Sequence, residues 1–119
     1  MVQDGKLILL DLPLLVWGAV GQYVQIIFKY CLQKAQERRN ISENARPVFL
    51  ASDESHLLYA PSDQLFQTTA RSSRTIVLNA TQSISNYFAA LGGERAEAEI
   101  HSYLGNLQLQ IFHQNVDVK

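Results

Sequence analysis

The sequence predicts an α/β fold in which a mainly parallel β-sheet is flanked by helices. Short apolar runs alternate along the chain with longer segments whose apolar residues recur at three- and four-residue steps. Strands that alternate with helices indicate a parallel sheet with helices on its faces. The 119 residues suffice for one compact domain, and the sequence contains no repeat or sign of a second domain.

Four apolar runs are expected to form the strands, at residues 6–11, 47–52, 74–80 and 107–113. Pro13 cannot continue a sheet ladder, so the first strand should stop near it. The second run ends in Asp53-Glu54, the third closes on Thr81-Gln82, and the fourth ends at His113. Because the carboxyl ends of parallel strands share one edge of the sheet, ligands are expected at that edge.

The helices are expected at residues 18–39, 63–72, 84–91 and 94–103. The first has one apolar stripe, which should face the core: Val20, Val24, Ile27, Phe28, Cys31 and Ala35. On that stripe Cys31 is interpreted as a buried small hydrophobe. Gly92-Gly93 stops the third helix.

Composition excludes several classes of protein. Hydrophobic residues make up 47% of the chain and charged residues 18%, and the net charge of −1 gives no overall attraction to nucleic acid or anionic lipid. Residues 7–20 are apolar, but Asp11 and Pro13 interrupt the run, so no membrane span is expected. The N-terminus has no signal-peptide pattern, and the lone cysteine fits a reducing compartment, so a cytoplasmic location is expected.

The acidic pair Asp53-Glu54 is the main candidate for chemistry. An Asp after a buried strand can hold Mg²⁺ through water, and an adjacent Glu can orient or deprotonate a second water, as in the Walker B motif of ATP-hydrolysing motors. Such a pair can also simply start a loop or cap a helix.

Four further residues are candidates for the site, and each also has a simpler structural explanation. Gln82 can sense a γ-phosphate or orient the attacking water, or it is a solvent-facing loop residue. Arg71 and Arg74 can stabilise charge on a transferring phosphoryl group, in the same subunit or in a neighbour, or they are helix C-terminal cations that favour the dipole. Asp11 could hydrogen-bond to a ligand of a bound metal, or it could cap the end of a strand.

Other motifs are absent from the sequence. No G-x-x-x-x-G-K-[ST] Walker A motif occurs, so tight nucleotide binding by this chain alone is not expected. His56, His101 and His113 have no ligand-type spacing to one another or to Cys31, which argues against zinc. The G-x-S-x-G motif of a nucleophile elbow does not occur in the sequence either. A phospho-receiver domain would need a second acid beside Asp11 and a Lys after a late strand, and the chain has neither.

In five segments the chain resembles the ATPase domain of type IV secretion coupling proteins, the conjugative DNA-transfer motors. The segments are residues 6–13, 47–54, 65–74, 81–87 and 104–113. The Asp-Glu and Thr-Gln segments are shared by many RecA-like P-loop NTPases, including FtsK-type and HerA-type translocases. Ala70-Arg-Ser-Ser-Arg74 and Leu104-Gly-Asn-Leu107 narrow the resemblance to the conjugation-like branch.

The resemblance implies a RecA-like half-domain from a ring-forming, hexameric motor that moves DNA using ATP and Mg²⁺. Asp53 would be the Mg²⁺-linked Walker B acid, Glu54 the catalytic acid, and Gln82 the γ-phosphate sensor. Arg71 or Arg74 would sense or stabilise charge in trans. Relaxosome accessory proteins are implied as partners.

The family's P-loop would lie upstream of Met1, so the chain is expected to be the second half of a motor domain, inactive alone. A separate alternative is a non-enzymatic module that docks on, or inhibits, a full-length motor or a relaxosome protein. A third is a truncated remnant without function.

Overall fold

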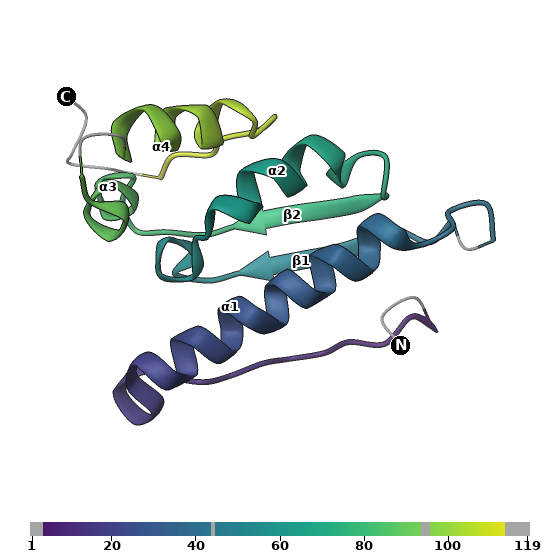
Figure 1. The fold of residues 1–119 in the computed structure, drawn as a ribbon, viewed down its shortest axis with the longest axis horizontal. Coiled ribbons are helices and arrows are strands. Elements are labelled where there is room, and N and C mark those ends of the chain that lie inside the picture. Colours follow the sequence, from purple (N-terminus) through teal and green to yellow (C-terminus); the bar gives the residue numbers. More distant parts are fainter. Residues whose placement is uncertain (1–3, 44, 94–95, 114–119) are drawn as a thin grey trace.

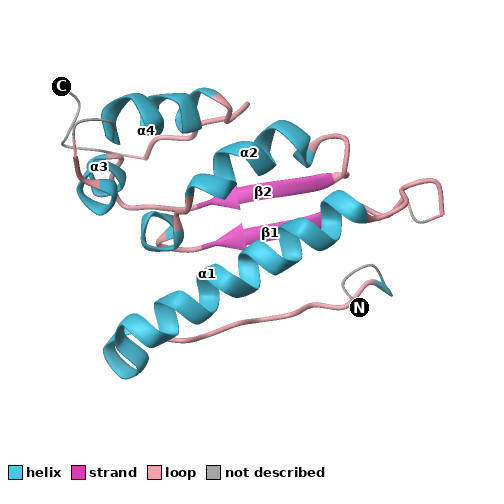
Figure 2. Ribbon diagram, in the orientation of Figure 1, coloured by secondary structure: helices cyan, strands magenta, loops and turns pink. Residues whose placement is uncertain are grey.

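The computed structural model describes residues 4–43, 45–93 and 96–113 and has mixed helices and strands (Figures 1 and 2). Helix α1 (Leu14–Arg38) is followed by strand β1 (Val48–Ser52), the 3-10 helix η2 (Ser55–Leu58), helix α2 (Pro61–Ala70) and strand β2 (Thr75–Asn79). Helices α3 (Ser85–Leu91) and α4 (Ala96–Gly105) complete the order. The α/β class expected from the sequence is compatible with this arrangement.

The sheet within the described residues has two parallel strands, β1 and β2. They pair in register from Val48 with Thr75 to Ser52 with Asn79. The predicted second and third strands are therefore present, each within one residue of its expected start and shortened by at most one residue at its end.

The predicted first and fourth strands are wrong. Residues 6–11 and 107–113 have no strand pairing and are irregular segments, the first alongside α1 and the second following α4 (Figure 2). Both are strongly apolar, yet Leu7 is 95% exposed and Leu109 is 76% exposed. Their apolar runs gave the strand prediction, but a strand also needs a neighbour to satisfy its backbone groups, and among the described residues neither segment has one.

Helix α1 turns its predicted apolar stripe to solvent, which contradicts the expected orientation. Val20 is 69% exposed, Ile27 is 61% exposed, and Cys31 is exposed rather than buried. The buried side chains of α1 are polar instead: Lys29, Gln33 and Gln36. The prediction failed because periodicity identifies residues that share a face but not which face meets the core.

An ion pair explains why the polar face of α1 is inside. Lys29 Nζ lies 2.5 Å from Asp63 Oδ2 on α2, and Gln33 Nε2 donates to Asp63 Oδ1 over 2.7 Å. Lys29 also donates to the carbonyl of Leu58. Burial lowers the pKa of Lys29, and the neighbouring Asp63 carboxylate partly offsets that shift. Buried charges persist only when they are paired in this way.

The helices cover one face of the sheet and leave the other bare. The inward residues Leu50 and Val77 line a small polar cavity together with Lys29 of α1 and Phe66 of α2. On the opposite face Phe49 is 70% exposed and Leu78 is 62% exposed. Parallel sheets are normally covered on both faces, so this bare face is unusual.

A second cluster of buried residues lies where α3 and α4 meet η2. Tyr87, Ile100 and Tyr103 are almost fully buried, and Tyr59, Phe88, Leu91 and Leu104 pack against them. The predicted fourth helix was placed at 94–103; residues 94–95 lie outside the described residues, and the observed helix extends to Gly105. This cluster supports the loops at the carboxyl ends of the two strands.

Candidate functional site

The two polar loops predicted to form a site do lie together at the carboxyl edge of the sheet. Because Ser52 pairs with Asn79 in the parallel register, Asp53-Glu54 and Thr81-Gln82 leave the sheet side by side. The backbone ties the two loops: Ala80 N donates to Ser52 O over 2.9 Å, and Ser55 N donates to Ala80 O over 2.9 Å.

Glu54 and Gln82 are in direct contact. Gln82 Nε2 donates a hydrogen bond to Glu54 Oε1 over 2.7 Å. Glu54 adopts a left-handed conformation with φ 44°, which a non-glycine residue rarely adopts. Its own backbone N–H donates to Asp53 Oδ1 over 2.9 Å, which holds the turn. The sharp turn therefore directs the Glu54 carboxylate toward the neighbouring loop.

His56 is a member of the site that the sequence analysis did not assign to it. Its Nδ1 lies 3.0 Å from Thr81 Oγ1 and 3.5 Å from Glu54 Oε2. The Thr81 hydroxyl donates to Ser83 O over 3.2 Å, so it accepts from His56, and Nδ1 carries the hydrogen. The sequence signal was weak: a histidine two residues after an acidic pair matches no motif.

Ser55 anchors the loop from below. Its hydroxyl donates to Ala80 O over 2.8 Å and accepts from the Tyr87 hydroxyl over 2.6 Å. Nearby, Asn79 Nδ2 donates to the Tyr103 hydroxyl over 2.7 Å, and the Tyr59 hydroxyl donates to Glu99 Oε1 over 2.9 Å. These bonds fix the strand ends onto the tyrosine cluster formed by Tyr59, Tyr87 and Tyr103.

Burial changes the ionisation of that cluster. Desolvation raises the pKa of all three tyrosines, and for Tyr59 the hydrogen bond to Glu99 adds to the effect. Their hydroxyls therefore remain protonated donors at neutral pH. The rings also pack edge to face: Tyr59 and Tyr103 have centroids 4.9 Å apart with planes at 76°. The floor beneath the site is thus neutral and rigid.

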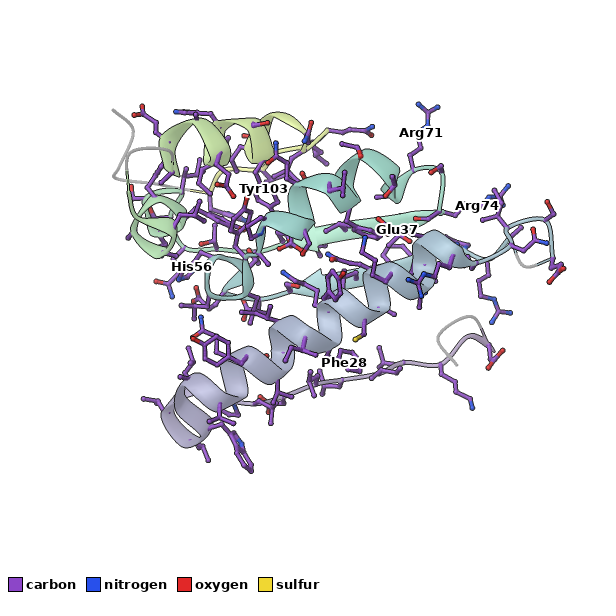
Figure 3. The ribbon with its side chains drawn as sticks, viewed as in Figure 1. Phe28, Glu37, His56, Arg71, Arg74 and Tyr103 are labelled. Carbon is purple, nitrogen blue, oxygen red and sulfur yellow. The ribbon has the colours of Figure 1, made fainter. Side chains whose placement is uncertain are left out.

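The structure does not bring the two candidate arginines to this edge. Arg74 directly precedes β2 and Arg71 follows α2, so both lie at the amino end of the strands (Figure 3). In the same view His56 lies at the opposite, carboxyl end of the strands. A strand of five residues spans roughly 15 Å at about 3.3 Å per residue, so neither guanidinium reaches Glu54 within one copy.

The predicted Asp11 candidate also changes place. It lies in the irregular segment ahead of α1 and does not end a strand.

Arg74 and Arg39 bind backbone carbonyls near the amino ends of the strands. Arg74 has φ 50° and donates through Nη1 to Ala45 O over 2.9 Å, while Arg39 donates to the carbonyls of Ser73 and Arg46. These cations stabilise the turns that enter the two strands.

The donor set at the carboxyl edge fits Mg²⁺ only with other ligands. Among the described residues, no group of three or more His, Cys, Asp and Glu could hold a metal ion. Asp53 is exposed and supplies one carboxylate, while Glu54 is engaged by Gln82. Mg²⁺ commonly uses one or two protein carboxylates with phosphates and waters, so Asp53 suits a Mg²⁺ that arrives with a nucleotide.

Within the described part of the chain, no helix has the length and apolar content needed to cross a bilayer. Comparison of the sequence and the fold with family models, with curated proteins and with solved structures gave no match.

Proposed function

We propose that the chain supplies the Walker B and sensor elements of a RecA-like, ATP-driven DNA-translocating motor of the conjugative coupling-protein type. In this proposal Asp53 holds Mg²⁺ through water, Glu54 polarises the attacking water, and Gln82 senses the γ-phosphate. ATP and Mg²⁺ are the cofactors, and the motor works in the cytoplasm.

The observation that carries the proposal is the hydrogen bond between Gln82 and Glu54. It joins two loops that leave neighbouring parallel strands at the same edge. An acid and an amide placed side by side there are what a water-activating and phosphate-sensing pair requires.

The phosphate cradle must come from outside this sequence. The chain contains no Walker A motif, and its described loops include no run of glycines that leads into a helix after a strand. Asp53 and Glu54 therefore act only when a P-loop-bearing chain or segment is joined to them. In isolation the chain should hydrolyse ATP poorly or not at all.

The arginines fit a role in a neighbouring subunit. Arg71 is exposed at the end of the sheet opposite to Glu54, and its guanidinium is in no ion pair with a described carboxylate. In a ring, such a group of one copy can face the nucleotide of the next, and an arginine supplied in trans stabilises transition-state charge. Arg71 or Arg74 therefore acts between subunits of a homo-oligomer, hexameric by resemblance, that contacts DNA and a relaxosome accessory protein.

The test is ATP turnover when the chain is joined to a P-loop-bearing partner. The wild-type chain should support Mg²⁺-dependent hydrolysis, and Glu54→Gln should abolish turnover while ATP binding is retained, a loss of about 10²–10⁴-fold for a general base. Glu43→Gln is the matched control, because Glu43 is an exposed loop carboxylate that accepts a hydrogen bond from Asn40 and lies outside the proposed site. Hydrolysis that persists in Glu54→Gln would remove Glu54 from the proposed role.

A second candidate is a non-enzymatic interaction module, and the bare sheet face favours it. Phe49, Ile76 and Leu78 are 70%, 46% and 62% exposed on one face of the sheet, which suits a protein partner. Stable binding to a full-length motor without any turnover would favour the module, and turnover that depends on Glu54 would favour the motor.

A further inference from the structure

The Glu54 carboxylate faces two different neighbours through its two oxygen atoms. Oε1 accepts a hydrogen bond of 2.7 Å from Gln82 Nε2, and Oε2 lies 3.5 Å from His56 Nδ1. The Glu54 side chain is 37% exposed, so the carboxylate remains open to a water molecule. Gln82 has a role in the proposed function, whereas the contact with His56 has none.

The imidazole of His56 is held by a hydrogen bond and by ring packing. Its side chain is only 12% exposed. Nδ1 lies 3.0 Å from Thr81 Oγ1, and the ring meets that of Tyr87 edge to face, with centroids 6.2 Å apart and planes at 72°. A side chain whose own rotamer is fixed by packing is suited to hold a neighbouring group in one position.

The hydrogen on His56 Nδ1 lies between two acceptors. Thr81 Oγ1 accepts it, because the Thr81 hydroxyl itself donates to Ser83 O over 3.2 Å. Glu54 Oε2 is the second acceptor, and 3.5 Å is long for a hydrogen bond. Catalytic hydrogen bonds are often long before substrate binds and shorten in the substrate complex, so this distance suits a contact that tightens during the reaction.

We propose that His56 is a positioning residue for Glu54, an inference that rests on the proposed ATPase function. The last torsion of a glutamate side chain is soft, so a bond to one oxygen alone leaves the carboxylate free to turn. Gln82 fixes Oε1 and His56 fixes Oε2. Through Thr81, His56 also ties the Glu54 loop to the loop that carries Gln82.

The consequence concerns the rate of hydrolysis and not the affinity for ATP. A water molecule bound to a fixed Glu54 carboxylate meets the γ-phosphate in one orientation, and such orientation lowers the barrier of the chemical step. His56 itself touches neither ATP nor the attacking water in this proposal. Loss of His56 should therefore lower kcat and leave KM for ATP unchanged.

Nuclear magnetic resonance of the full chain tests the contacts without any ATPase activity. The imidazole nitrogen signals of His56 should show that Nδ1 carries a hydrogen, and Thr81→Val and Glu54→Gln should each shift them. The signals of His101, 66% exposed on α4, serve as the reference and should stay in place. Unchanged His56 signals in both variants would show that neither contact forms, which would overturn the proposal.

The role is tested by the kcat and KM for Mg²⁺-dependent ATP hydrolysis in the chain joined to its P-loop-bearing partner. His56→Phe keeps a ring against Tyr87 but removes the donor, so kcat should fall about tenfold or more at constant KM. His56→Asn places an amide N–H close to the position of Nδ1 and should restore most of the rate. His101→Phe is the matched control and should match the wild type. Urea unfolding shows that each variant remains folded.

The outcomes separate this inference from the proposed function. A wild-type kcat in His56→Phe, with turnover lost in Glu54→Gln, would overturn the role of His56 and leave the proposed function in place. A loss in His56→Phe that His56→Asn does not restore would also overturn it, because the Nδ1 donor would then not be what matters. Turnover that persists in Glu54→Gln would overturn the proposed function and the positioning role together.

Discussion

Gln82 donates a hydrogen bond of 2.7 Å to Glu54 and so connects the loops that follow two neighbouring parallel strands. Neither loop is held by this bond alone. Ser55 and Ala80 bind each other through backbone and hydroxyl bonds, and the tyrosine cluster supports both from below. The site is therefore a feature of the strand ends and of the helices α3 and α4 that pack beneath them.

Removal of the Tyr87 hydroxyl should weaken the support of the Glu54 loop. Tyr87→Phe deletes the donor to Ser55 Oγ but keeps the packed ring, and the free energy of unfolding should fall by about 1 kcal/mol. Urea unfolding measures the change. Tyr23→Phe is the control, since Tyr23 is 64% exposed on α1, and its stability should match that of the wild type.

The buried Lys29–Asp63 pair should be needed to hold α1 in place. Lys29→Met leaves the Asp63 carboxylate buried without its cation, and the expected loss is about 3–5 kcal/mol. The double variant Lys29→Met/Asp63→Asn should lose less than the sum of the two single changes, because no buried charge is left unpaired.

Lys34→Met is the control for that series, because Lys34 pairs with Glu37 in a more exposed position and should change stability by less than about 1 kcal/mol. Equal losses at Lys29 and Lys34 in urea unfolding would mean that the polar face of α1 is not buried.

The tyrosine cluster should make the protein less stable at high pH. Burial raises the pKa of Tyr103 above its ordinary value of 10.0, so in that range the folded state binds more protons than the unfolded state. Stability is then fully present below pH 10 and falls as the pH rises further, by up to about 1.4 kcal/mol per pH unit for each proton released on unfolding.

Urea unfolding between pH 8.5 and pH 11.5 tests this expectation. Tyr103→Phe removes one such group and should give a shallower decline than the wild type, while Lys29 titrates equally in both proteins. Identical slopes would show that Tyr103 is not buried in solution.

Substitutions on the two faces of the sheet should differ in cost. Leu78→Ser alters a side chain on the bare face and should change the stability of the chain by about 0.5 kcal/mol or less. Val77→Ala alters the adjacent residue on the covered face and should cost about 1–2 kcal/mol. A loss above 2 kcal/mol for Leu78→Ser would mean that something covers that face.

Much of the fold was predictable because its signals are local. The two paired strands are short apolar runs between polar turns, and Gly92 lies just after the end of its helix, as expected. Helix α2 was also expected, but it begins at Pro61, two residues earlier than the predicted start, because proline suits the first turn of a helix. The proximity of Asp53-Glu54 to Thr81-Gln82 also followed from the sequence, since strand ends in a parallel sheet share an edge.

The remaining features depend on pairs of residues far apart in the chain. No periodicity shows that Lys29 finds Asp63 34 positions away, yet this pair decides which face of α1 is buried. The outer strands were predicted from apolar runs in the sequence, and such a run does not show whether a neighbouring strand is there to pair with it. His56 was missed because its partners, Thr81 and Glu54, come together only in the folded chain.

The most direct measurement of the central claim is a double-mutant cycle between Glu54 and Gln82 in the turnover of the chain joined to its P-loop-bearing partner. If the two residues act as one water-positioning unit, Gln82→Ala should lower the turnover rate strongly only when Glu54 is present. The turnover rate of the double variant should then be barely below that of Glu54→Gln alone. Independent, additive losses, or no loss at Gln82, would contradict a shared catalytic role for the pair.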